Sequence, residues 1–180
     1  MADRIYLKIQ GAQQGLISSG ASSEDSLGND HQQGHEDEIF VQATDHVVTR
    51  PTDPRSGSPA GPRVHKPLTI TKYVDKSSPL LYNALASGEG LSQCVLNYYR
   101  DTANVPNQHY FTITLTNARI VDITSVRPTY LNILQFRTQG MDAPPISWLE
   151  SVQFSYSKIE WRHEVAGTSG SDDTTKPAGA

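Results

Sequence analysis

The sequence predicts an all-β protein, mainly antiparallel, in which a small closed β-barrel of two packed sheets carries one flanking α-helix. Apolar residues recur at every second position in most segments, only one segment has helical spacing, and prolines interrupt the stretch between residues 49 and 67. Parallel strands need long crossover connections, usually helices, so one helix is too few for a parallel sheet. Antiparallel strands closed into a barrel, with the helix over an open side or end, satisfy all three observations.

The first two predicted strands flank a long polar connection. Ile5, Leu7 and Ile9 alternate with polar or amphipathic residues, which predicts a strand with one apolar face. A second strand is expected over residues 36–48. The connection, residues 11–35, is long for a structureless loop, so we expect it to be functional or partly folded. Three apolar side chains could attach it to the barrel: Leu16, Ile17 and Leu27.

A proline-rich loop is expected at residues 49–67. Its prolines exclude a central strand or a helix interior, and its arginines make it locally basic on an acidic protein. Proline holds such a segment extended, so less entropy is lost when the segment docks on a neighbour. We therefore expect residues of this loop, and one tyrosine of a later strand, to take part in self-assembly: Arg50, Thr52, Asp53, Pro54, Arg55 and Tyr99.

A strand beginning at Leu68 precedes the single predicted helix, which covers residues 77–88. Ser77 or Ser78 can cap its first backbone N–H groups, and proline is tolerated in the first turn. Gly88 is suited to a left-handed helix end. One face of the helix is apolar, formed by Leu81, Ala84 and Leu85.

The remainder of the chain is again predicted to be strands, over residues 91–100, 109–117, 118–126 and 147–165, with an irregular stretch at 127–146. In the last strand the apolar parity changes near Ser157 and Lys158, which predicts a bulge or a bend from one sheet to the other, with Phe154 and Trp161 both buried. Residues 167–180 contain no large apolar side chain and are expected to be a disordered polar tail, which leaves one domain at residues 1–166.

The composition limits the classes of partner. The 180 residues carry a formal net charge of −4 with no dense basic face, so nucleic acid is not an expected partner. No segment approaches the roughly 20 apolar residues of a membrane-crossing helix, and Lys8 and Gln10 interrupt the N-terminal apolar stretch that a signal peptide would need. Cys94 is the only cysteine, which fits a reducing cytoplasm and indicates a buried, inert thiol.

Candidate catalytic and metal-ligating residues are scattered. His31 lies near the run His-Glu-Asp-Glu at residues 35–38, and histidine beside carboxylates can bind a divalent metal. Successive strand residues point to opposite faces, however, so this run cannot converge on one ion. The other carboxylates have no spacing that compels pairing: Asp75, Asp101, Asp122, Glu150 and Glu160. We therefore predict no catalytic residue, no metal site and no cofactor.

Four segments resemble the hemolysin-coregulated protein (Hcp) family, the inner-tube proteins of bacterial type VI secretion. They are residues 5–11, 34–41, 65–85 and 152–170, and the most specific parts are TKYVDKSSP at 71–79 and SKIEW at 157–161. The resemblance implies a barrel with one flanking helix, hexameric rings and a stacked hollow tube. It implies assembly in the bacterial cytoplasm, then secretion without a cleaved signal peptide. The implied partners are further copies of the chain, a spike protein, a contractile sheath, a baseplate and small effector proteins in the lumen.

Two other functions remain open at this stage. A monomeric β-barrel could bind a peptide or carbohydrate through its tyrosines, although Tyr98, Tyr99 and Tyr110 are more simply explained as packing residues. A hydrolase could use the scattered carboxylates. The preferred hypothesis is a self-assembling structural subunit, because the segment at 91–100 has apolar residues at both strand parities and a small barrel buries only one of those faces.

Overall fold

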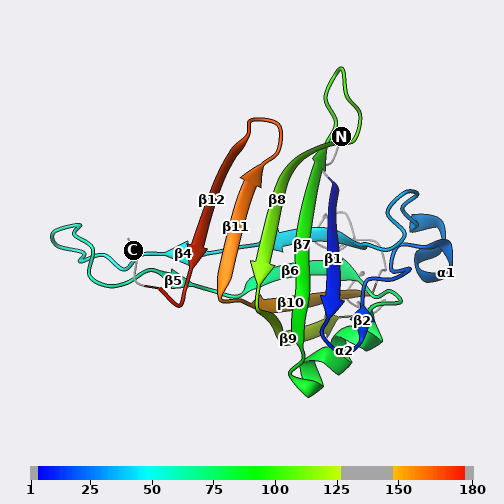
Figure 1. Ribbon diagram of the computed structural model, residues 1–180, viewed down its shortest axis with the longest axis horizontal. Coiled ribbons are helices and arrows are strands. Elements are labelled where there is room, and N and C mark those ends of the chain that lie inside the picture. Colours follow the sequence, from blue (N-terminus) through cyan, green and yellow to red (C-terminus); the bar gives the residue numbers. More distant parts are fainter. Residues whose placement is uncertain (1–3, 127–147, 177–180) are drawn as a thin grey trace, which may run out of the picture.

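The computed structural model describes residues 4–126 and 148–176, which form twelve strands, two α-helices and one 3₁₀ helix (Figure 1). The elements up to the second helix are β1 (Arg4–Gly11), β2 (Gly15–Leu16), α1 (Glu24–Leu27), η1 (Gly28–Asp30), β3 (Ile39–Asp45), β4 (Val48–Thr49), β5 (Val64–His65), β6 (Leu68–Tyr73) and α2 (Ser78–Ser87). The later elements are β7 (Gly90–Arg100), β8 (Gln108–Thr116), β9 (Ala118–Val126), β10 (Leu149–Ser155), β11 (Lys158–His163) and β12 (Thr168–Asp173).

Six strands close a barrel in the order β7–β9–β10–β6–β3–β1, with β1 returning to β7. The closing pair β1–β7 is antiparallel from Arg4 opposite Tyr99 to Gly11 opposite Leu91. β7 reaches β9 only at its first two residues and then pairs with β8 along the rest of the same edge. The named strand pairs are antiparallel throughout, so the predicted fold class is confirmed.

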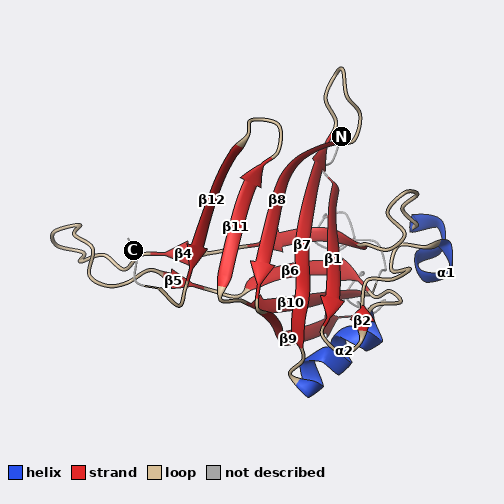
Figure 2. Ribbon diagram, in the orientation of Figure 1, coloured by secondary structure: helices blue, strands red, loops and turns tan. Residues whose placement is uncertain are grey.

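The barrel is extended on one side by β8, β11 and β12, which continue the sheet beyond β7. Figure 2 shows β12, β11, β8, β7 and β1 side by side, crossing over the layer formed by β9, β10 and β6. The core lies between these two layers, as in sheet-on-sheet packing generally. It consists of aliphatic residues from both layers, from α2 and from the connection at 11–35, together with Phe154 and the side chain of Cys94, which is fully buried as predicted.

Helix α2 lies where the sequence predicted it and packs on β9. Gly88 ends it in the left-handed conformation, with φ of 66°, and Leu81 and Ala84 are fully buried. The predicted serine cap is wrong, because Ser77 makes no side-chain cap hydrogen bond. Ser77 instead donates hydrogen bonds from its backbone N–H and its hydroxyl to the carboxylate of Asp75.

The last long strand passes from one layer of the sheet to the other at the predicted position. β10 pairs with β6 and β9, whereas β11 pairs with β8 and β12, and the break falls between Ser155 and Lys158. Phe154 is fully buried, and Trp161 is partly buried against the core. The predicted change in which alternate residues face inward is therefore confirmed. A strand that passes from one layer to the other reverses the face that it presents inward.

Two predictions need correction. Residues 168–173 form β12 and are not a disordered tail, because they pair along the free edge of β11 by backbone hydrogen bonds that need no apolar side chain. One helix was expected, but the connection at 11–35 also holds α1 and η1, and Ile17 and Ala21 attach it to the core. The irregular stretch expected at 127–146 lies outside the described residues.

Candidate self-assembly surfaces

Residues 48–65 form a narrow ribbon, here called the arm. Its base is the two-stranded sheet β4–β5, with Val48 opposite His65. A bridge between Thr52 and Pro59 continues the pairing outward, and the tip is closed by a 2.8 Å hydrogen bond from the Gly57 N–H to the Asp53 carbonyl. Figure 1 shows the arm extending beyond the barrel at one end of the molecule's longest axis. It is therefore an ordered projection.

The arm presents its side chains to solvent. Every residue from Val48 to Ala60 is exposed, and Val48 and Val64 are 41% and 46% exposed although both are apolar. The Asp53 carboxylate accepts a 2.7 Å hydrogen bond from the Arg55 N–H, which orders the tip. Five of the six residues predicted for self-assembly lie together here: Arg50, Thr52, Asp53, Pro54 and Arg55.

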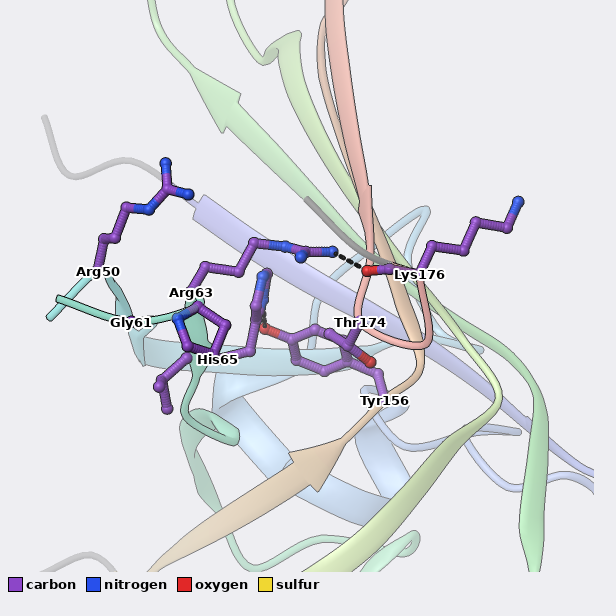
Figure 3. A pocket seen from close by; sticks show the side chains of 9 residues that line it. Arg50, Gly61, Arg63, His65, Tyr156, Thr174 and Lys176 are labelled. Atoms are coloured by element: carbon purple, nitrogen blue, oxygen red, sulfur yellow. Dashed lines mark hydrogen bonds between the residues drawn. The ribbon is translucent and has the colours of Figure 1, made fainter. Parts of the chain in front are cut away.

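The base of the arm is attached to the C-terminal part of the chain (Figure 3). Nε of Arg63 donates to the carboxylate of Asp172 in β12, and its Nη2 donates to the carbonyl oxygens of Asp173 at 2.6 Å and Lys176 at 3.0 Å. This guanidinium, together with the neighbouring His65, holds the pKa of Asp172 below its usual range. β12 thus receives and orients the arm.

A second group of contacts joins the arm base to the barrel through Tyr156. Its hydroxyl lies 2.9 Å from Nε2 of His46 and 3.1 Å from Nδ1 of His65, and Nε2 of His65 lies 2.8 Å from Oδ2 of Asp172. In the neutral imidazole of His65 the carboxylate favours the proton on Nε2, so that Nδ1 accepts from the tyrosine and the tyrosine accepts from His46. Burial raises the pKa of Tyr156 to about 12, and burial followed by the neighbouring His65 lowers the pKa of His46.

These contacts form one wall of a basic cleft of about 730 Å³. Figure 3 shows Arg50 extending away from the His65–Tyr156 pair at the outer rim. The cleft offers cationic and hydrogen-bonding groups suited to binding acidic or polar surfaces. Its lining residues are Arg50, Gly61, Pro62, Arg63, Val64, His65, Tyr156, Thr174 and Lys176.

The sixth predicted residue, Tyr99, lies elsewhere, in β7. Its ring is 5.0 Å from that of His109 and meets the rings of Tyr6 and His35 edge-on at 5.6 and 5.2 Å. It lines a pocket of about 350 Å³, here called the acidic pocket, with Lys8, Gly34, His35, Glu36, Asp37 and Glu38. The structure therefore separates Tyr99 from the arm and brings it to the histidine–carboxylate run considered as a metal site.

The carboxylates of that run have separate partners. Glu38 accepts from Nδ1 of His35 at 2.5 Å, Glu36 accepts from the Gly34 N–H and Asp37 from the Gly20 N–H, both at 2.9 Å. Within residues 4–126 and 148–176 no group of three His, Cys, Asp or Glu side chains is placed to hold a metal. This run is therefore a polar loop in which Glu36 and Asp37 bind backbone N–H groups and Glu38 binds a histidine side chain.

Sequence reasoning missed a buried ionic cluster. Asp75 and Glu150, expected to be scattered, both contact the ammonium group of Lys72, at 3.0 and 2.6 Å. A signal was present, because Lys72 continues the inward parity of Leu68 and Ile70 in β6, and an inward lysine requires a buried anion. No comparable pattern in the sequence indicated the pairs that Asp172 forms with Arg63 and His65.

No helix within the described parts of the chain is long and apolar enough to cross a membrane.

Comparison with known proteins identifies a family. The family described as "Type VI secretion system effector, Hcp" matches residues 6–163. The "Major exported protein" of Pseudomonas aeruginosa is 48% identical over 177 residues, which cover 98% of each chain.

Solved structures agree with this assignment. One described as "Crystal structure of Hcp protein" superposes with a TM-score of 0.84 at 44% identity, covering 96% of this chain and 99% of the other. The "Secreted protein Hcp3 from Pseudomonas aeruginosa" gives a TM-score of 0.76, also at 44% identity, covering 96% and 98%. With the family match, the fold and a relative of this identity all in agreement, the chain belongs to the Hcp family of type VI secretion tube proteins, which are structural and not enzymatic.

Proposed function

We propose that this chain assembles with copies of itself into closed rings of six subunits and that the rings stack into a hollow tube. The number six rests on the Hcp family alone. A head-to-tail contact whose rotation closes produces a ring, whereas a contact whose rotation does not close produces a filament. Family membership makes the tube the expected product.

The observation that carries the proposal is the arm. A projecting ribbon with two half-exposed valines contributes nothing to the barrel core, yet Arg63, His65 and Tyr156 hold its base in place. Holding a binding element in its bound shape lowers the entropy lost on association. Such an ordered and exposed ribbon is suited to binding a neighbouring subunit.

The rest of the system follows from the family. We propose that the subunits fold in the bacterial cytoplasm, that a contractile sheath on a baseplate drives the tube with its spike out of the cell, and that export needs no cleaved signal. The lumen is proposed to hold small effector proteins. Support comes from relatives, one called a major exported protein and another a secreted protein.

Native mass spectrometry of the isolated protein, over a range of micromolar concentrations, tests the proposal. We expect a species of six times the 19.8 kDa subunit mass, with electron microscopy of the same sample revealing rings and stacks. A monomer that persists as the concentration rises would refute self-assembly.

A further inference from the structure

Formal charge is segregated along the molecule. The segment from Val48 to Lys66 carries four basic residues and one acidic residue, whereas residues 23–38, here called the lobe, carry six acidic residues and no lysine or arginine. Figure 1 shows the arm at one end of the longest axis and the lobe, which contains α1, at the other. The two charged regions of one subunit cannot meet, so each is available to another copy.

The lobe supplies five of the seven residues that line the acidic pocket. Glu36 and Asp37 are exposed and form no ion pair with any described residue, while Lys8 is the one cation that lines the pocket. Tyr99 adds an aromatic ring beside these carboxylates. Carboxylates next to a tyrosine ring suit a guanidinium, which forms forked hydrogen bonds with carboxylates and is attracted to aromatic faces.

The arm carries guanidinium groups that are free to fill such a pocket. Arg63 is paired with Asp172 at the arm base, but neither Arg50 nor Arg55 forms an ion pair with a described residue. Arg55 lies in the turn at the tip, and Arg50 extends from the rim of the basic cleft (Figure 3). The arm extends beyond the barrel, so its tip can reach a neighbouring subunit (Figure 1).

We propose that Arg55, at the tip of the arm of one subunit, docks in the acidic pocket of the next subunit, against Glu36, Asp37 and Tyr99, and that Arg50 adds positive charge along the same arm. This inference rests on the proposed self-assembly and names the surface that the arm binds. The contact is head-to-tail, since the two surfaces lie at opposite ends of one subunit. It accounts for the separation of Tyr99 from the arm, because the two halves of one interface must lie apart on each copy.

Charge reversal tests the contact, with assembly followed by native mass spectrometry and analytical ultracentrifugation. Arg50→Glu with Arg55→Glu reverses the arm, and Glu36→Arg with Asp37→Arg reverses the pocket. Each pair is expected to raise the concentration needed for half-assembly by about tenfold or more. An equimolar mixture of the two variants is expected to assemble again, since each now offers a surface complementary to one on the other.

Two controls separate this contact from loss of folding and from general charge effects. Glu36→Gln with Asp37→Asn keeps oxygen acceptors for the Gly34 and Gly20 N–H groups, and we expect unchanged thermal stability with weakened assembly. Glu24→Arg with Asp25→Arg makes the same charge change on the lobe outside the pocket, and we expect assembly within about twofold of wild type.

The outcomes distinguish the two levels of the proposal. A wild-type monomer would remove both the ring and this contact. If the wild type forms rings, three results would overturn this contact and leave the ring proposal intact. They are unchanged assembly of the reversed arm, no recovery in the mixture, and an equal loss in the Glu24→Arg, Asp25→Arg control. Loss in both reversed variants with recovery in the mixture supports it.

Discussion

The Nζ atom of Lys72 lies 2.6 Å from Oε1 of Glu150, and the two side chains are 0% and 1% exposed. The same ammonium group contacts Asp75 at 3.0 Å and the Ser78 hydroxyl at 3.1 Å. The cluster therefore joins β6, β10 and the first turn of α2 inside the protein. A buried charge without its partner is costly, so the three elements are held in one arrangement.

Replacing Lys72 by methionine is expected to lower the free energy of unfolding by about 3–5 kcal/mol, because Asp75 and Glu150 would remain buried without a counter-ion. Denaturant unfolding measures the change. As the matched control, Lys72→Met combined with Asp75→Asn and Glu150→Gln removes all three charges and is expected to recover most of the loss. A single variant within about 1 kcal/mol of wild type would contradict this role.

Gly11 marks a close approach between β1 and the side chain of Glu89. A Cβ atom at residue 11 would collide with Oε1 of Glu89, which already accepts hydrogen bonds from the N–H groups of Gln13 and Gln14 at 2.6 and 2.9 Å. We expect Gly11→Ala to destabilise the fold by about 1–3 kcal/mol. Gly90→Ala, where a Cβ meets nothing within 4 Å, is the control, and thermal or denaturant unfolding of both variants decides the comparison.

The alternation of apolar and polar residues was sufficient to predict most strands of the barrel from sequence. Ile113 and Leu115 of β8 are buried as their spacing requires, and the parity change before Ile159 located the passage between the two layers. These signals are local, since strand geometry places every second side chain on one face. They do not depend on which strands become neighbours.

The features that sequence did not predict depend on contacts between distant segments. β12 has no apolar pattern and exists because β11 offers it an edge, and Arg63 meets Asp172 across 109 positions. Likewise, Tyr99 reaches the acidic pocket only because β1 and β7 close the barrel beside the lobe. Such pairs follow from topology, which residue spacing alone does not specify.

Acidification is expected to lower the free energy of unfolding through His46. Burial lowers the pKa of this histidine in the folded protein below its ordinary value of 6.5, so the unfolded chain binds the proton more readily. The free energy of unfolding is thus highest above pH 6.5. It falls as the pH decreases from 6.5 to the pKa of His46 in the folded protein. Unfolding measured between pH 8 and 5 should show this decline, and His46→Gln should flatten it. A variant with the wild-type pH profile would contradict the assignment.

Shortening the arm is expected to separate folding from assembly. Deletion of residues 52–60 removes exposed side chains and the Thr52–Pro59 bridge but leaves β4, β5 and the contacts of Arg63 and His65 in place. We expect the melting temperature to stay close to that of wild type, because no core residue is lost. Assembly should weaken, since the tip with Arg55 is gone and its docking area with it.

Native mass spectrometry and circular dichroism of the shortened variant, at matched concentrations, give the two readouts. Arg63→Ala is the complementary change, because it keeps the full arm and removes the guanidinium that binds Asp172 and the carbonyl groups of Asp173 and Lys176. An arm that is present but poorly held should bind a neighbour more weakly than wild type and more strongly than the deletion, since it must be ordered on docking. Wild-type assembly in the deletion variant would show that the arm is not an interface, whatever the behaviour of Arg63→Ala.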